Sequence, residues 1–320
     1  MQTPTIATMS VNSPQLSPFY PTRSTANTVK AVETAETPAT WMSLDSALLS
    51  EAYSPSSHAP NFLQILDSYQ ARSDAARQAL GPGEVMVYGP AEREFIRLYE
   101  ATNASPPLLV FFHGGYWQEG SADMSLFPAL ELPGSGISFA AVGYTLAPES
   151  TVSTIVDQCA QALAKLAHAY FQRHSGARIV LSGSSAGAHL AAMMMTVNWQ
   201  AHGFATTPFS SAVLLSGVYD LRPLVSTYIN DALKMSAALA LRNSPLFCEL
   251  PAAVPCTICW GENETAEFRQ QSERFGRRLG AAGIDTRLFE VADRNHFDIV
   301  FDLSRPNTTV GRDVRARLKD

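Results

Sequence analysis

Short apolar runs alternate with helical patterns along most of this chain, and this alternation restricts its fold more than any other feature. Leu108–Phe112 is apolar at every position, as in strands covered on both faces of a sheet. Val152 to Tyr170 instead carries apolar residues at helical spacing. The alternation predicts an α/β fold with a mostly parallel central sheet flanked by helices. We expect strands at 95–99, 108–112, 137–142, 179–181, 212–215, 257–260 and 286–291, and helices at 152–170, 186–199 and 267–279.

Composition agrees with a folded domain and excludes several classes of protein. Of the 320 residues, 46% are hydrophobic and 16% charged, which allows a sizeable core. The net charge is −6 and the only basic cluster, Arg312 to Lys319, is short, so we expect no nucleic-acid partner. The longest apolar runs have about six residues, whereas a membrane helix needs about 20, so we expect no membrane span.

The first 40 residues differ from the rest, because 18 of them are Ser, Thr or Pro. Such a segment buries too little apolar surface to offset its ordering entropy, so residues 1–40 are predicted to be a flexible tail and 41–320 the folded domain. The segment has neither the early basic region nor the apolar core of a signal peptide. Four cysteines are too few for a disulfide scaffold and favour a reducing, cytoplasmic location.

Gly183-Ser-Ser-Ala-Gly187 follows an expected strand and opens an expected helix. A serine at the centre of such a G-x-S-x-G turn is lifted clear of the sheet, and the two glycines relieve crowding. The helix N-terminus behind it favours developing negative charge. In this context Ser185 is predicted to be a nucleophile rather than part of an ordinary glycine-rich turn.

His113-Gly-Gly-Tyr-Trp117 follows the expected strand 108–112. Its successive glycines leave backbone N–H groups open to a substrate oxygen. We therefore expect an oxyanion hole formed by the N–H groups of Gly114, Gly115 and Ala186. His113 precedes the glycines and is expected to make structural hydrogen bonds rather than act as a base.

A serine nucleophile needs a base and an orienting acid, which in this arrangement follow it in the order Ser, acid, His. Glu264 lies just after the expected strand 257–260, and His296 is the one histidine that follows it in the sequence. The predicted triad is Ser185, Glu264 and His296. Other acids near these positions leave the choice of acid open: Glu262, Glu267, Asp293 and Asp298.

Cys256 and Cys259 have a spacing that invites a metal or redox interpretation. Residues i and i+3 of a strand point to opposite faces, so this pair is predicted to be buried in the core and not to chelate. No other cluster has metal-ligand spacing. We expect no metal and no cofactor.

Taken together, these motifs resemble kynurenine formamidase (arylformamidase) of the α/β-hydrolase type, from about Tyr53 to the C-terminus. The resemblance implies an α/β-hydrolase fold with Ser185 as nucleophile, His296 as base and an acid at position 264, where the family usually has Asp and this chain has Glu. The tryptophan after His-Gly-Gly-x is its more specific sign. Further matching segments are Val87–Pro90 with Arg93, Tyr144–Pro148, Ser185–Leu190, Ser216–Leu224, Asn230–Leu233, Ser244–Leu246 and Glu267–Phe268.

The resemblance implies cleavage of an aryl formamide such as N-formylkynurenine, releasing formate and kynurenine. Two alternatives stay open: a carboxylesterase or specialised biosynthetic hydrolase of a small aromatic ester or amide, and a non-catalytic binding protein on a hydrolase scaffold. We expect a small, aromatic substrate bordered by Tyr116 and Trp117. Residues 219–247 are predicted to form a small helical cap with Tyr228 and Phe247 as further lining. A homodimer is compatible with the sequence but not indicated by it.

Overall fold

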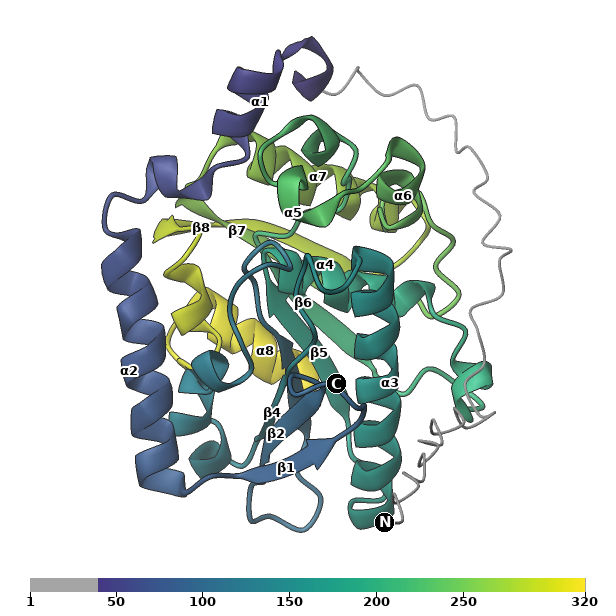
Figure 1. The fold of residues 1–320 in the computed structure, drawn as a ribbon. Coiled ribbons are helices and arrows are strands. Elements are labelled where there is room, and N and C mark those ends of the chain that lie inside the picture. Colours follow the sequence, from purple (N-terminus) through teal and green to yellow (C-terminus); the bar gives the residue numbers. More distant parts are fainter. Residues whose placement is uncertain (1–39, 320) are drawn as a thin grey trace, which may run out of the picture.

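Eight strands form one sheet in the computed structural model, which describes residues 40–319 (Figure 1). The predicted tail, residues 1–40, lies outside this range except for its last residue. The strand order is β1-β2-β4-β3-β5-β6-β7-β8. The strands are β1 (Glu84–Val87), β2 (Phe95–Tyr99), β3 (Leu108–Phe112), β4 (Ser138–Val142), β5 (Ile179–Ser184), β6 (Ser211–Leu215), β7 (Cys256–Asn263) and β8 (Thr286–Asn295).

The sheet is parallel from β4 to β8 and antiparallel at its other edge, where β2 pairs with β1 and β4. In the centre, Phe112 of β3 lies opposite Val142 of β4 and Gly183 of β5. All seven predicted strands are present. The short edge strand β1 was not predicted, since only Met86 of its four residues is buried.

Helices cover both faces of the sheet (Figure 1). The predicted helix at 186–199 is shorter than expected: α4 ends at Met193 and continues as a 3-10 turn. The α-helices are α1 (Ser46–Ala52), α2 (Phe62–Leu80), α3 (Val152–Arg173), α4 (Ala186–Met193), α5 (Asn230–Leu233), α6 (Ala237–Arg242), α7 (Ala266–Ala281) and α8 (Thr309–Lys319). The 3-10 helices are η1 (Thr40–Ser43), η2 (Pro55–His58), η3 (Asp123–Ser125), η4 (Phe127–Leu130), η5 (Pro133–Ser135), η6 (Met194–Thr196), η7 (Trp199–His202), η8 (Pro223–Ser226) and η9 (Ile299–Asp302). No helix within residues 40–319 is long and apolar enough to cross a membrane.

Strand residues alternate between two hydrophobic clusters, one on each face. In β3, Leu108, Val110 and Phe112 join the cluster that includes α3, α4 and α7. Leu109 and Phe111 join the other, which includes α8. The same alternation places Cys256 in the first cluster and Cys259 in the second, so the prediction that they face opposite ways is confirmed.

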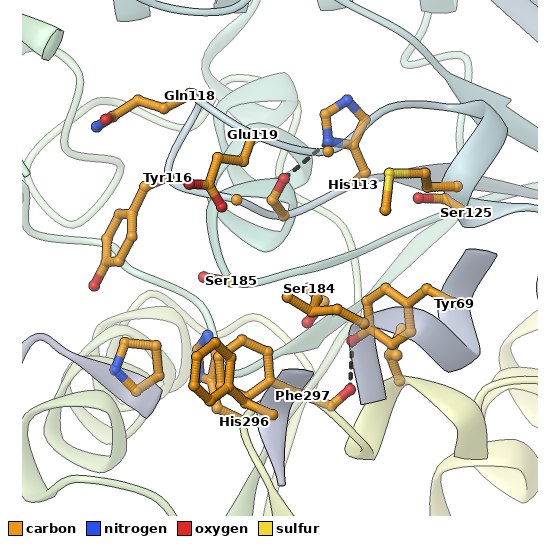
Figure 2. Close-up of a pocket in the computed structure, with 18 of the residues that line it drawn as sticks. Tyr69, His113, Tyr116, Gln118, Glu119, Ser125, Ser184, Ser185, His296 and Phe297 are labelled. Carbon is orange, nitrogen blue, oxygen red and sulfur yellow. Dashed lines mark hydrogen bonds between the residues drawn. The ribbon is translucent and has the colours of Figure 1, made fainter. Parts of the chain in front are cut away.

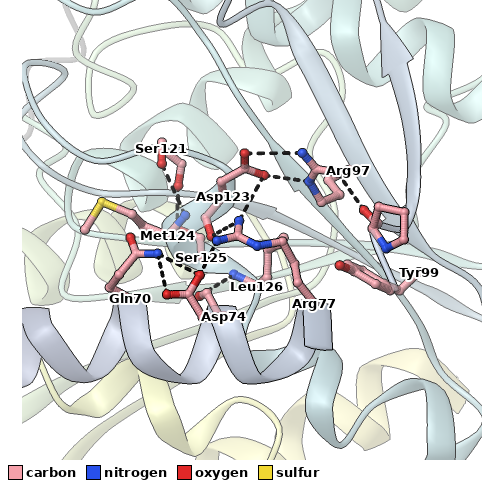
Figure 3. Close-up of polar contacts among 12 residues, drawn as sticks. Gln70, Asp74, Arg77, Arg97, Tyr99, Ser121, Asp123, Met124, Ser125 and Leu126 are labelled. Carbon is pink, nitrogen blue, oxygen red and sulfur yellow. Dashed lines mark hydrogen bonds and ion pairs between the residues drawn. The ribbon is translucent and has the colours of Figure 1, made fainter. Parts of the chain in front are cut away.

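Helix α2 is fastened to the sheet by a group of polar contacts around Asp123 (Figure 3). Arg97 on β2 donates to both carboxylate oxygens of Asp123, at 2.6 and 3.2 Å. Arg77 on α2 donates to the Asp123 backbone carbonyl at 3.3 Å. The Ser73 hydroxyl accepts the backbone N–H of Leu126 at 3.0 Å. These contacts hold the loop after β3 between α2 and the sheet.

The turn between β5 and α4 depends on a close approach between backbones at Gly187. A Cβ at this position would lie 1.9 Å from the carbonyl oxygen of Phe112 and 2.6 Å from that of His113. Ser185, at the turn, has a φ of 58° in the left-handed region. This conformation is costly for a residue with a side chain and persists only where its surroundings enforce it.

We predict that Gly187→Ala destabilises the protein by more than about 3 kcal/mol, because the added methyl meets backbone that cannot move aside. Gly280→Ala is the control: Gly280 is on α7, and a Cβ there meets nothing within 4 Å. This substitution should stabilise the protein by up to about 1 kcal/mol through helix propensity. Thermal and urea denaturation of both variants would check the pair. An unchanged melting temperature for Gly187→Ala would contradict the close packing.

Candidate active site

Ser185 lies at the carboxyl edge of the sheet, in a cavity of about 360 Å³. It follows β5, and its backbone N–H donates to Leu215 O at 2.9 Å, which ties the turn to β6. Its side chain is largely buried, with 6% of the residue exposed. Ser185 and His296 both line the cavity and are both labelled in Figure 2. The structure thus brings the predicted nucleophile and the predicted base into one pocket.

His296 is held by a buried carboxylate. Its Nδ1 lies 2.9 Å from Glu264 Oε2, and both side chains are nearly inaccessible to solvent. The imidazole also packs against the ring of Phe268, with centroids 4.3 Å apart. The extra methylene of glutamate therefore does not prevent the carboxylate from reaching the imidazole.

The second oxygen of Glu264 has two donors of its own. Ser216 Oγ donates to Oε1 at 2.5 Å, and the backbone N–H of Gly261 donates to it at 2.6 Å. Ser216 is fully buried and has a φ of 51°. Hydrogen bonds of this kind satisfy a carboxylate that would be costly to bury alone. Sequence reasoning missed Ser216, although its place just after the buried strand β6 puts it at the same sheet edge as Ser185.

Of the other acids considered, two bond elsewhere. Glu262 accepts the backbone N–H of Asp293 at 3.0 Å, and Asp298 accepts that of Asn295 at 2.8 Å. The hydrogen bond to His296 therefore favours Glu264 among the alternatives that the sequence left open.

The two glycines after His113 lie in the same cavity as Ser185. A Cβ on Gly114 would be 3.3 Å from the Cβ of Ser185, and both Gly114 and Gly115 line the cavity. Gly115 has a φ of +101°, which a residue with a side chain rarely adopts. Ala186 is the first residue of α4, where backbone N–H groups have no partner within the helix. Gly114 and Gly115 therefore share a cavity with Ser185, and Ala186 directly follows Ser185 in the sequence.

His113 and His189 are buried and have structural contacts. Nδ1 of His113 lies 2.8 Å from Gly114 O and 3.0 Å from the Tyr144 hydroxyl. Nε2 of His189 lies 2.7 Å from Asn243 O. Burial lowers the pKa of each to about 4, so both imidazoles are neutral at pH 7. This agrees with the interpretation of His113 as a structural residue.

Two of the four residues expected to border the substrate do line the cavity. Tyr116 lines it and donates its hydroxyl to Tyr53 O at 2.6 Å. Tyr228 also lines it, and its hydroxyl lies 3.0 Å from Ser54 Oγ. Both tyrosines therefore connect the cavity wall to the segment between α1 and η2.

Trp117 and Phe247 do not line the cavity, and for them the expectation was wrong. The indole of Trp117 is fully buried and contacts the His189 ring edge-on, with centroids 4.8 Å apart. Phe247 packs under the guanidinium of Arg222, 4.2 Å from the ring centroid. In both cases burying a large ring against the protein outweighs exposing it to a ligand.

Much of the apolar wall comes from a part of the chain for which sequence reasoning predicted no element. Phe62, Leu66 and Tyr69 of α2 line the cavity. They are spaced four and three residues apart, as on one face of a helix, so the sequence did contain a signal. Tyr69 also donates its hydroxyl to Phe297 O, next to His296 (Figure 2). Residues 219–247 form η8, α5 and α6. Tyr228 and Ile229, which lie between η8 and α5, line the cavity.

The described residues offer no grouping for a metal ion: within 40–319, no three His, Cys, Asp or Glu side chains are placed to hold one. The buried cysteines are also unsuited to ligation, since burial raises the pKa of Cys256 to about 12 and that of Cys259 well above its ordinary value.

Comparison with known proteins agrees with this architecture. The family model described as alpha/beta hydrolase fold matches residues 109–299. A kynurenine formamidase from Danio rerio is 35% identical over 283 residues, covering 83% of this chain and 94% of that protein. One from Salmo salar is 34% identical over 277 residues, covering 82% and 93%.

A solved structure from Silicibacter sp. TM1040 superposes with a TM-score of 0.74 at 25% identity, covering 83% of this chain and 98% of that one. Fold, family match and relatives agree, and the relatives span nearly the whole described domain. This chain belongs to the α/β-hydrolase fold family and is a hydrolase of the kynurenine formamidase type.

Proposed function

We propose that this enzyme hydrolyses an aryl formamide such as N-formylkynurenine, with Ser185 as nucleophile, His296 as base and Glu264 as the orienting acid. The observation that carries the proposal is the buried hydrogen bond of 2.9 Å between Glu264 and His296, because His296 lines the same cavity as Ser185. The formamidase relatives support the choice of substrate, since they are similar along 94% of their own length in one case.

In the proposed reaction the Ser185 hydroxyl attacks the formyl carbon while its proton passes to Nε2 of His296. The carbonyl oxygen becomes an oxyanion and accepts hydrogen bonds from the backbone N–H groups of Gly114, Gly115 and Ala186. Each such donor lowers the barrier by about 3 kcal/mol. Glu264, bonded to Nδ1, stabilises the imidazolium that forms.

Collapse of the tetrahedral intermediate breaks the C–N bond. His296 returns its proton to the leaving nitrogen, so a neutral arylamine departs and a formyl-enzyme remains. His296 then removes a proton from a water molecule that attacks the formyl carbon. The second collapse releases formate and restores the Ser185 hydroxyl. The cycle needs no metal and no cofactor.

The aromatic lining of the cavity suits an aromatic leaving group. Its volume of about 360 Å³ is at the lower end of the range for small-molecule pockets, which is about 300–1,000 Å³. Aromatic rings gather on one side of it: Phe62, Tyr69, Phe111, Phe127 and Phe297. The same apolar side would also admit an acyl group larger than formyl. This observation keeps a carboxylesterase of small aromatic esters as the second candidate.

Ser185→Ala should abolish hydrolysis and leave the fold intact, because the side chain faces the cavity. Losing a triad nucleophile lowers turnover on the order of 10⁶-fold in a well-studied protease. Turnover of N-formylkynurenine and of short and long p-nitrophenyl esters would be measured, with thermal denaturation as the control for folding. A folded variant that keeps more than about a tenth of the wild-type rate would contradict the nucleophile.

Glu264→Ala should impair cleavage of a formanilide more than cleavage of an activated p-nitrophenyl ester. The arylamine needs a proton from a correctly held His296, whereas p-nitrophenolate leaves without one. Glu262→Ala, two residues away and exposed, is the control and should affect neither substrate. Equal losses on the two substrates in Glu264→Ala would argue against this role.

Ser216→Ala should lower kcat/KM about tenfold, because a lost hydrogen bond to a buried charged group costs about 1.5–3 kcal/mol and part of this loss reaches the His296 contact. Ser182→Ala is the matched control: Ser182 is equally buried and donates to Val213 O at 2.8 Å. It should lower stability without lowering kcat/KM. If both variants lose activity only in proportion to stability, Ser216 has no role in positioning Glu264.

A further inference from the structure

The cavity wall has an unbalanced charge. Apart from its two histidines, Glu119 is the one charged residue among those that line the cavity, and no lysine or arginine of residues 40–319 lines it. Glu119 follows the oxyanion glycines by four residues. Its side chain extends from this loop toward Ser185, on the same side as Tyr116 and Gln118 (Figure 2).

The backbone fixes the position of Glu119. The N–H groups of Gln118 and Glu119 both donate to Gly115 O at 2.9 Å, which closes a tight turn. Tyr116 and Trp117 within this turn have positive φ values of 48° and 60°. The buried indole of Trp117 anchors the turn in the core. Glu119 therefore stands on a rigid loop rather than on a freely moving one.

The carboxylate of Glu119 has no hydrogen-bond or ion-pair partner among the described residues, although its neighbours do. Gln118 donates its side-chain amide to Ile229 O at 2.8 Å. Tyr116 donates to Tyr53 O. Glu119 is exposed and lines the cavity. A negative group left without a partner beside a nucleophile can interact with charge on the substrate.

The negative charge of Glu119 favours a substrate with a positive group over one with a negative group. A carboxylate next to the oxyanion hole opposes the negative charge that develops in the transition state. A cation on the substrate would offset this repulsion and would itself be attracted. A carboxylate on the substrate would add to the repulsion and would find no lysine or arginine on the described wall.

We propose that Glu119 is a specificity-determining residue that selects substrates whose leaving group carries a protonated amine and disfavours those that carry only a carboxylate. The inference rests on the proposed function for the reaction itself. For a zwitterionic leaving group it places the ammonium toward Glu119 and the carboxylate toward solvent.

The test uses three ring-matched aryl formamides with a side chain that ends in an amine, a methyl group or a carboxylate. For the full-length wild-type chain, kcat/KM should decrease in that order. Glu119→Gln should lower kcat/KM about fivefold for the amine and raise it about fivefold for the carboxylate. Fivefold corresponds to about 1 kcal/mol, since 1.4 kcal/mol is tenfold. The methyl substrate should not become slower. Both changes should shrink as salt is added, because exposed charges are screened.

Glu149→Gln is the matched control, since Glu149 is exposed, lies outside the cavity and loses the same charge. It should leave kcat/KM for all three substrates within about twofold of the wild-type value, because a distant exposed charge is screened. Glu119→Asp should keep the wild-type order. Equal effects of Glu119→Gln on the three substrates would overturn the proposal, as would a wild-type preference for the carboxylate.

Failure of the proposed function gives a different result. In that case the wild-type enzyme would not cleave even the aryl formamide whose side chain ends in a methyl group. Three esters with the same amine, methyl and carboxylate side chains would then replace the formamides. The same reversal of charge preference in Glu119→Gln would support the inference, and its absence would overturn it.

Discussion

The close approach of α4 to the end of β3 is the contact on which the site depends. Gly187 lies against the carbonyl of Phe112, where a Cβ would be only 1.9 Å away. This contact brings the nucleophile turn beside Gly114, whose hypothetical Cβ would lie 3.3 Å from that of Ser185. Ser185 and Gly114 are therefore neighbours because two backbones touch. The strained φ of Ser185 is enforced by the same packing.

A second constraint is the burial of charge around Glu264. A carboxylate removed from water is costly unless donors replace the lost hydration. The donors are Ser216 just after β6, Gly261 on β7 and His296 just after β8. The three donors also fix the direction of the carboxylate. The same set of hydrogen bonds thus stabilises the buried carboxylate and orients His296.

The cavity itself is assembled from parts that are distant in sequence. Helix α2 supplies an aromatic and aliphatic wall, and the contacts of Asp123 with Arg97 and Arg77 hold that helix on the sheet. The loop after β3 supplies the polar side, with Glu119 facing the same space as Ser185 (Figure 2). The cavity thus combines a wall of apolar and aromatic side chains with a single carboxylate among the described residues, and these are the two features on which the proposed substrate preference rests.

The sequence by itself determined the class of fold and the order of its elements. Fully apolar runs such as Leu108–Phe112 can only be buried on both faces, and Ser185 could be placed on a strand-to-helix turn because glycines flank it. Glu264 could be predicted as the acid, but neighbouring acids stayed open as alternatives, because a sequence does not give distances across a sheet edge. The edge strand β1 was missed because it buries too little to show a pattern.

Tertiary structure alone decided which side chains meet. Trp117 directly follows Tyr116, yet Tyr116 lines the cavity and Trp117 fills the core, because the turn after Gly115 sends successive side chains in different directions. His296 and Ser216, which contact Glu264, lie 32 and 48 residues from it in the sequence. Tyr69 of α2 bonds to Phe297, which is 228 residues away. Such contacts arise from the packing of whole elements, and no local pattern records them. Local patterning determined the elements of this protein, and long-range packing decided its site.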